Sequence, residues 1–413
     1  MTMTLRSSTI PSALQSAANF RSWQRDCVER GLLPVIGVAG GRGKSTVVRM
    51  LDAILRQMRL RTATWTNLGI EIRGKRERVE ISGWSKALSR LSESSIDVAI
   101  QELHWSTINA VGLPPASYPL FAVTNLIGGH DAPFDNEQAR AVRRGAFRVA
   151  GAVNSHGVLA INGDDPGLVE STHLAESMLA MTSLSRESPS LRRHLAHGGS
   201  GVWIDGSDIR LGDLDANTAL CSVQSIRSGH DGAAQFQIAN ALTAIAIASS
   251  IGVDRYSIAK AICQFEATAE ILPGSFNDFP NGDFRAIVDG AAPSWHLRHV
   301  LRAANPRNRR RQITVLGDLE RLPESDIREI GRLLGRHRGA IILHSNKSPQ
   351  LLERLRKGIA ANDLPPVVIH LPTERRALNR ALKTARPDDL VLMLTGPDPG
   401  PSIRAINRQV THR

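Results

Sequence analysis

The chain has 413 residues, of which 42% are hydrophobic and 22% charged, and its formal net charge is +12. This length exceeds what one core ordinarily organises, so we expect two domains, and no apolar run approaches the roughly 20 residues of a membrane helix. The three cysteines lack metal-ligand or disulfide spacing, which fits a reducing cytoplasm and predicts a cytoplasmic protein; they are Cys27, Cys221 and Cys263.

Arginine supplies nearly all of the positive charge, with local clusters at residues 307–311, 192–193 and 375–376. Such a field attracts polyanions, including nucleic acid. The basic residues are nevertheless scattered, and no aromatic-interleaved or helix-turn-helix pattern accompanies them. We therefore favour a solvated basic surface over a nucleic-acid partner, and we expect no membrane partner.

Apolar runs typical of buried strands alternate with helical patterns along the chain, which predicts an α/β fold with a mostly parallel sheet and helices on its faces. The predicted strands cover residues 33–38, 97–101, 120–123, 158–161, 285–288, 313–316, 340–343, 367–370 and 390–394. Helical stretches at 237–251 and 257–265 separate the two strand series, and Leu272-Pro273-Gly274 marks a break. We expect a lead-in over residues 1–30, a central domain over 31–272 and a smaller α/β domain over 273–413.

The segment VIGVAGGRGKSTVVRMLDAIL, residues 35–55, predicts a strand, a glycine loop and a helix, which is the context that a phosphate-binding loop requires. Glycines allow a tight turn whose N–H groups point into one concavity, and the helix beginning near Lys44 adds its positive N-terminal end. Lys44 is expected to reach the outer phosphates of ATP, and the Ser45 hydroxyl to hold Mg²⁺. Arg42, inside the loop, either adds charge there or points to solvent.

The glycine spacing departs from the usual P-loop, because Val38 stands five residues before Gly43. It resembles instead the G-x-x-G-x-x-G-K-[ST]-T pattern of Mur ligases, which the chain carries at residues 37–46. The stretch GGRGKST resembles the corresponding sequence of poly-γ-glutamate synthases, and later segments resemble the C-terminal ligase half of cyanophycin synthetases. They occur in family order over roughly residues 33–400: VAIQELH, AVTNLIGGHDAPF, VLAINGDDP, RRHLAHGGSGVW, FQIANALTAIA and PGSFNDFPNGDFRAIVD.

This resemblance implies a central ATP-binding domain, a Rossmann-like C-terminal α/β domain and roles for matching residues. Glu102, at a strand end, matches the family carboxylate that meets Mg²⁺ and the γ-phosphate, and His130 the histidine beside a second metal. Asn240 matches the asparagine that reads the adenine edge, and Asp289 the acid that contacts the nucleotide from the C-terminal domain. The implied catalytic residues are Lys44, Glu102 and His130; the metal ligands are Ser45, Glu102 and His130; and the nucleotide contacts are Gly40, Gly41, Arg42, Gly43, Lys44, Ser45, Thr46, Asn240 and Asp289.

Each of these assignments has a structural alternative. Glu102 could be a surface glutamate, His130 a loop histidine and Asn240 a helix-packing or capping residue. Asn67 matches a substrate-facing loop of the family only loosely.

Four positions depart from the family pattern. Gly129 replaces the aspartate before the metal histidine, Ser275 the arginine of P-G-R, and Ala292 the histidine of the D-Y-A-H-N-P-like segment. The lysine that many relatives carbamylate has no counterpart, and Arg143 and Arg144 stand in its region. Arginine cannot take up CO₂ at neutral pH because its pKa lies above ~12.

Three functions follow from these features. The first is an ATP-dependent carboxylate–amine ligase that works through an acyl phosphate on a small-molecule or peptide substrate, which a partner protein could deliver. The second is a nucleotide-binding pseudo-ligase, a scaffold subunit of a polymer or peptide synthesis system, and the departures favour it. The third, least favoured, is a P-loop ATPase acting on nucleic acid.

Overall fold

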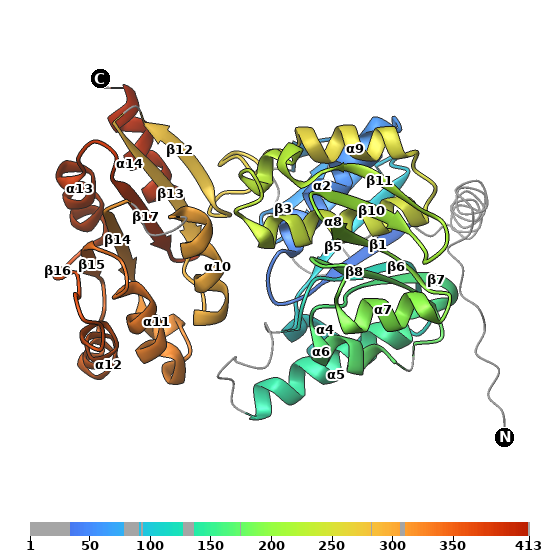
Figure 1. Cartoon of the computed structure of the whole chain (residues 1–413), viewed down its shortest axis with the longest axis horizontal. Coiled ribbons are helices and arrows are strands. Elements are labelled where there is room, and N and C mark those ends of the chain that lie inside the picture. Colours follow the sequence, from blue (N-terminus) through green and yellow to red (C-terminus); the bar gives the residue numbers. More distant parts are fainter. Residues whose placement is uncertain are drawn as a thin grey trace. The chain divides into compact units, whose positions relative to one another are not determined.

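The computed structural model describes residues 34–77, 91, 94–126, 136–173, 175–281, 283–305 and 310–411. The chain divides into two compact units between Phe265 and Glu266 (Figure 1). Residues 266–276 carry no helix or strand, and the break expected at Leu272-Pro273-Gly274 lies in this connection. The domain limits given above stay a prediction.

The first unit is built on an 11-stranded sheet of order β11-β10-β9-β8-β7-β6-β1-β5-β2-β3-β4. Strand β1 pairs in parallel with both β5 and β6, and β2, β7, β8 and β9 continue the parallel part on the two sides. The remaining strands, β3, β4, β10 and β11, extend the sheet edges in antiparallel pairs. The strands are β1 (Val35–Ala39), β2 (Thr62–Thr66), β3 (Gly69–Ile72), β4 (Lys75–Arg76), β5 (Val98–Leu103), β6 (Tyr118–Val123), β7 (Val153–Asn162), β8 (Met178–Ser183), β9 (Ser200–Asp205), β10 (Asp208–Gly212) and β11 (Asn217–Ser222).

Helices cover both faces of this sheet: α2, α8 and α9 pack together on one face, and α4 to α7 lie on the other (Figure 1). Helix α8 is apolar all round, which is the pattern of a buried helix, and it packs on β6 to β9 and on α2. The described helices of this unit are α2 (Lys44–Gln57), α4 (Trp105–Val111), α5 (Asn136–Ala152), α6 (Pro166–Thr172), α7 (Pro189–Ala196), α8 (Gln235–Ser250) and α9 (Arg255–Gln264).

The second unit has a six-stranded sheet of order β12-β13-β17-β14-β15-β16, parallel except for the β12–β13 pair. Side chains of α13 and α14 form a core with the inner strands on one face, while α10, α11 and α12 pack against one another in sequence. Its elements are β12 (Asn277–Asn281), β13 (Phe284–Gly290), β14 (Gln312–Gly317), β15 (Gly339–His344), β16 (Val367–Leu371), β17 (Leu390–Thr395), α10 (Ser294–Ala304), α11 (Ile327–Leu334), α12 (Pro349–Ala360), α13 (Glu374–Thr384) and α14 (Gly400–Thr411).

The predicted fold class is confirmed, and each of the nine predicted strands coincides with an observed one. The sequence did not predict β2 to β4, β8 to β11 or β12. Strands β9 to β11 form a meander at one sheet edge, and β10 and β11 are only partly buried. Such strands need no long apolar run, so the criterion that found the central strands did not detect them.

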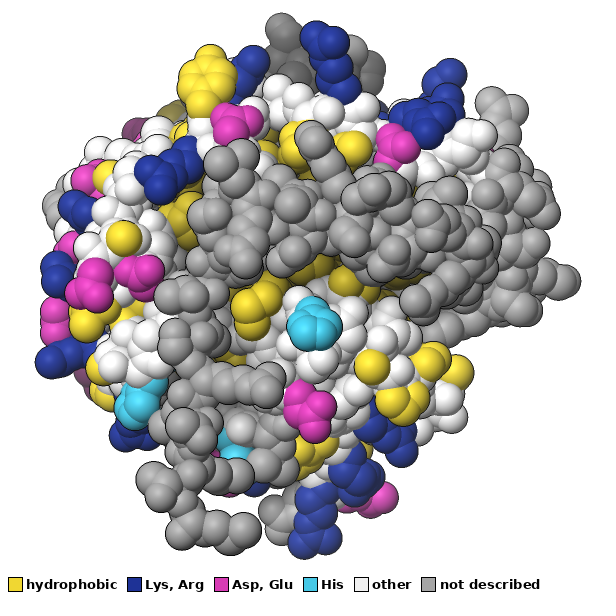
Figure 2. All heavy atoms as spheres, turned by 90° about the vertical axis from the view of Figure 1, so that its right-hand side faces the viewer, with side chains coloured by type: hydrophobic (Ala, Val, Ile, Leu, Met, Phe, Trp, Pro, Cys, Tyr) yellow, Lys and Arg dark blue, Asp and Glu magenta, His cyan; other side chains and the backbone are white. Residues whose placement is uncertain are grey.

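On the face drawn in Figure 2, Lys and Arg side chains occur at several separate places around the rim, and Asp, Glu and apolar side chains lie among them. Among the residues described, no helix combines the length and the apolar character needed to cross a membrane.

Candidate active site

The candidate site lies where the sheet order reverses around β1. Strand β1 runs parallel between β5 and β6, so the loop that follows it opens between the carboxyl ends of both neighbours. The register pairs Val38 with Glu102 on one side and Ala39 with Val123 on the other. Ligands of open α/β sheets bind in the crevice at such a reversal.

The glycines after β1 are required by close approach and by backbone conformation. Gly43 has φ of +87°, and a Cβ there would lie 2.1 Å from Oδ1 of Asn240. Gly40 has φ of +145°, and its Cβ would lie 2.0 Å from Oγ1 of Thr124. The first glycine of the motif, Gly37, instead packs against the Phe121 ring, since its Cβ would lie 2.3 Å away.

The segment that follows β6 holds this loop in place. The backbone carbonyl of Asn125 accepts the Gly41 amide at 3.0 Å, and its side-chain Oδ1 accepts the Arg42 amide at 3.0 Å. The Arg42 carbonyl in turn accepts Nδ2 of Asn125 at 3.0 Å and Oγ1 of Thr124 at 2.6 Å. Two loop amides are therefore used within the protein.

The first backbone amides of α2 directly follow the loop. The first i→i−4 bond of the helix runs from Val47 to the Gly43 carbonyl at 2.9 Å, so the amides of Lys44, Ser45 and Thr46 precede it. The N-cap Gly43 provides no side-chain cap, and the first turn contains no acidic residue. A 14-residue helix with this N-terminus presents partial positive charge to a ligand.

Lys44, Ser45 and Glu102 meet at the base of the loop. Ser45 Oγ donates to Oε2 of Glu102 at 2.7 Å, and Nζ of Lys44 lies 3.7 Å from Oε1. The Glu102 side chain is 2% exposed, so it is not a surface glutamate. Burial lowers the pKa of Lys44, the nearby Arg42 charge acts in the same direction, and Glu102 opposes them. The cluster is thus a buried charged site.

His104 belongs to the same cluster and was not assigned from the sequence. Its Nε2 lies 3.5 Å from Oε1 of Glu102. Burial lowers the pKa of His104, as does the charge of Lys44, whereas Glu102 raises it. The available signal was its position two residues after Glu102. His104 directly follows β5 and its backbone is still extended, so the two side chains face the same side.

The donor set here fits Mg²⁺ held jointly with phosphate oxygens. The Ser45 hydroxyl and the Glu102 carboxylate share one position, and Mg²⁺ is usually bound by one or two carboxylates together with substrate phosphates. In the described part of the chain, no group of three or more His, Cys, Asp or Glu side chains forms a metal site of its own.

Of the other sequence-derived residues, Asn240 is brought to the loop by the fold. Asn240 is 7% exposed on α8 against Gly43, and its Nδ2 donates to Oε1 of Gln237 at 3.2 Å. Asp289 ends β13 in the second unit, where Oδ1 accepts the Phe276 amide at 3.1 Å. Asn67 is exposed in the turn between β2 and β3.

Gly129, one of the positions that depart from the family pattern, lies outside the described residues, and so does the predicted metal ligand His130. Arg143 and Arg144 are exposed on α5, and Nη1 of Arg143 lies 3.9 Å from Oε2 of Glu170. These two arginines therefore face solvent.

A buried aspartate, also not assigned from the sequence, fixes the segment that holds the loop. Asp165 is 5% exposed, and its Oδ2 accepts the Leu126 amide at 2.8 Å while its Oδ1 accepts the Leu168 amide at 3.1 Å. Asp165 is the N-cap of α6, whose first residue is Pro166. The Asp-Pro pair signals a helix start in the sequence, but the bond to Leu126 follows only from the fold.

Comparison with known proteins identifies the family. A model described as the Mur ligase middle domain matches residues 38–248, half of the chain, and one described as the Mur ligase glutamate ligase domain matches residues 277–395. The chain belongs to the Mur ligase family. The predicted resemblance is confirmed, and the two matches fall in the two compact units.

Relatives of this Mur ligase family member are distant. The cyanophycin synthetase of Synechocystis sp. is 23% identical over 380 residues, which cover 87% of this chain and 42% of that protein. The UDP-N-acetylmuramoyl-L-alanyl-D-glutamate–2,6-diaminopimelate ligase of Thermosynechococcus vestitus is 24% identical over 373 residues, covering 87% of this chain and 71% of that protein. The chain thus spans less than half the length of the cyanophycin synthetase it matches.

Solved structures share the fold. E. coli FolC in complex with DHPP and ADP superposes with a TM-score of 0.62 at 18% identity, covering 99% of this chain and 95% of that one. A pseudomurein peptide ligase type C from Methanothermus fervidus gives a TM-score of 0.62 at 15% identity, covering 92% of this chain and 79% of that one. At these identities the likeness concerns the fold alone.

Proposed function

We propose that this chain is an ATP-dependent ligase that joins a carboxylate to an amine through an acyl phosphate. The observation that carries the proposal is the buried cluster of Lys44, Ser45 and Glu102 at the N-terminus of α2. A cation, a hydroxyl and a carboxylate beside the first amides of a helix are the groups that phosphoryl transfer uses. Membership of the Mur ligase family supports the same reading.

In the first step a carboxylate oxygen of the substrate attacks the γ-phosphorus of ATP, and ADP leaves. Lys44 and the amides at the start of α2 bind the phosphates and stabilise the charge that spreads over the transferring oxygens. The Ser45 hydroxyl and the Glu102 carboxylate would hold Mg²⁺. When bound, the ion neutralises negative charge on the β- and γ-phosphates.

In the second step the amine nitrogen attacks the acyl carbon, inorganic phosphate leaves, and the nitrogen loses a proton. The protein's part in this step is to position the two reactants and exclude water. We assign Asn240 to the adenine edge and Asp289 to a nucleotide contact made from the second unit. The acyl and amine substrates are small molecules or peptides.

The test is phosphate release from ATP across a panel of amino acids and acidic or basic peptides, supplied singly and in pairs. A ligase releases phosphate at a rate that depends on both a carboxylate and an amine, with an equimolar new amide detected by mass spectrometry. The Lys44→Ala chain should lose this activity.

Two results would contradict the proposal. Phosphate release that is insensitive to every added acid and amine would indicate an ATPase. Saturable nucleotide binding without any release would indicate the nucleotide-binding scaffold instead. The Lys260→Ala chain serves as the control, because Lys260 is an exposed lysine on α9 rather than a residue of the loop, and it should keep full activity.

A further inference from the structure

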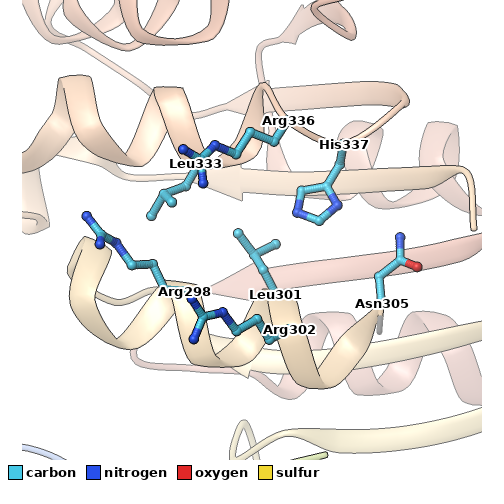
Figure 3. Close-up of a pocket in the computed structure, with 7 residues that line it drawn as sticks. All are labelled: Arg298, Leu301, Arg302, Asn305, Leu333, Arg336 and His337. Atoms are coloured by element: carbon cyan, nitrogen blue, oxygen red, sulfur yellow. The ribbon is translucent and has the colours of Figure 1, made fainter. Parts of the chain in front are cut away.

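Two features of the molecule have no part in the proposed ligation: a cavity in the second unit and a pair of cysteines in the first. The cavity, of about 280 Å³, lies between α10 and the end of α11 (Figure 3). Asn305 in its wall bonds the Arg310 backbone through both side-chain amide atoms, at 2.9 and 3.1 Å, and Arg298 donates to Glu329 at 2.7 Å. These polar groups are already engaged within the protein, whereas the two cysteines combine proximity with reactivity.

Cys221 and Cys263 are distant in the sequence and meet where α9 packs against β11. Strand β11 is the outermost strand at one end of the 11-stranded sheet, and α9 lies beside it (Figure 1). Near the beginning of both elements, Nη1 of Arg255 donates to Oγ1 of Thr218 at 2.8 Å. Cys263 follows Arg255 by about two helical turns, and Cys221 is the last residue but one of β11, so the thiols lie at the other end of the same contact.

A β-bulge directs the side chain of Cys221 toward α9. Ile209 of β10 pairs with Cys221 and Arg210 pairs with Ala219, so Leu220 is an additional residue in β11. Residues i and i+2 of a regular strand face the same side, and a bulge re-aims the side chain that follows it. Cys221 therefore shares the side of Thr218, which contacts α9, and not the side of Ala219, which is exposed to solvent.

The two thiols and the Ser225 hydroxyl form one hydrogen-bonded cluster. Cys221 and Cys263 are both reduced and bond to each other, and Oγ of Ser225 lies 3.3 Å from Sγ of Cys263. The bond from Cys221 lowers the pKa of Cys263 to about 6; burial opposes this shift, and the bond to Ser225 supports it. The bond to Cys263 and burial raise the pKa of Cys221. At pH 7 the pair therefore consists of a Cys263 thiolate and a Cys221 thiol that donates to it.

The pair is also accessible. Both cysteines are only partly buried, and Ser225 is exposed. The thiolate is the nucleophilic form of cysteine, and reactive cysteines combine a lowered pKa with access to solvent. A second thiol in contact with the first can resolve a mixed disulfide.

We propose that Cys221 and Cys263 form a reversible disulfide by exchange with low-molecular-weight disulfides. The Cys263 thiolate attacks one sulfur of the small disulfide, which gives a mixed disulfide and releases one small thiolate. Cys221 passes its proton to that thiolate and attacks the Cys263 sulfur, and the second small thiolate leaves. Two protein thiols are thereby oxidised to one disulfide, while the small disulfide is reduced to two thiols. The product links β11 to α9, which packs on α2.

The test measures the effective concentration of the two thiols by equilibrating the full chain with oxidised and reduced glutathione. Cys27→Ser is present throughout, so that the chain contains only this pair of thiols. Intact-mass spectrometry distinguishes the internal disulfide from mixed disulfides with glutathione, and peptide mapping locates it. The same equilibrium is measured in concentrated guanidinium chloride. We expect the folded chain to favour the disulfide about tenfold or more over the unfolded chain, because the fold already holds the two thiols together. Dithiothreitol should restore both thiols.

The matched control combines Ala219→Cys with Cys221→Ser. It keeps two thiols at nearly the same sequence separation but moves one of them to the solvent side of β11. Its effective concentration in the folded chain should be lower by about tenfold or more. The proposal is overturned by an effective concentration that is no higher in the folded than in the unfolded chain, by an equal value in the control, or by disulfides that form only between chains.

Discussion

Replacing Lys44 by methionine measures separately what the buried charge costs in folding stability and what it contributes to nucleotide binding. The change keeps an unbranched stem of similar length, with sulfur in place of one methylene, and removes the ammonium group. The attraction between Nζ and the Glu102 carboxylate, 3.7 Å apart, amounts to about 4.5 kcal/mol at an effective dielectric constant of about 20. The pKa of Lys44 is nevertheless lowered, so burial and the Arg42 charge together outweigh this attraction.

The direction of the Lys44 pKa shift determines whether the charge stabilises or destabilises the folded state. The folded state releases the Lys44 proton more readily than the unfolded chain, in which the lysine pKa is near its ordinary value of 10.5. The charged lysine therefore costs stability at every pH below its folded pKa, and the cost is relieved as pH rises from there toward 10.5. Lys44→Met should leave the free energy of unfolding unchanged or slightly increased at pH 7.

Nucleotide binding should change in the opposite direction. Loss of a charge-assisted phosphate contact costs ~1.5–3 kcal/mol, or about 10- to 150-fold in affinity. Urea denaturation without nucleotide and calorimetric titration with ADP measure the two quantities. Lys260→Met, the same replacement at an exposed position, is the control and should alter neither. A Lys44→Met protein that loses stability while binding ADP normally would make Lys44 a structural partner of Glu102, and the reasoning would be refuted.

Two further changes test the loop and its supporting helix. Gly43→Ala should lower the free energy of unfolding by ~1–2 kcal/mol because its φ is +87°. The contact of the new Cβ with Asn240 should add to this loss and weaken ADP binding. Gly206→Ala is the control: its φ is +63° with open space around the Cβ, so urea denaturation should show the backbone cost alone. Burial raises the pKa of Glu71, but its bonds to Arg49 outweigh this and hold the pKa below 4.5. The stability from this pair is therefore present above pH 4.5 and lost as pH falls through the folded pKa. Glu71→Gln should destabilise by ~1–3 kcal/mol at pH 7 and by progressively less as pH falls below 4.5, and a loss that does not change with pH would contradict this.

The sequence determined the central framework and the phosphate loop. Long apolar runs predicted β1, β5 and β6, because strands buried on both faces must be apolar throughout. The phosphate loop could be predicted because its residues are contiguous in the sequence. Gly40 and Gly43 do adopt positive φ. Strands β10 and β11 at the sheet edge gave no comparable signal, since their side chains are only partly buried.

Only the tertiary structure decided which distant residues meet at that loop. Ser45 contacts Glu102 because β1 and β5 pair in a register that the local sequence does not encode. The bonds between Arg42 and Asn125 depend likewise on the β1–β6 pairing. A motif specifies the backbone of its own segment, whereas contacts across strands and helices arise when burial of apolar surface fixes how those elements pack.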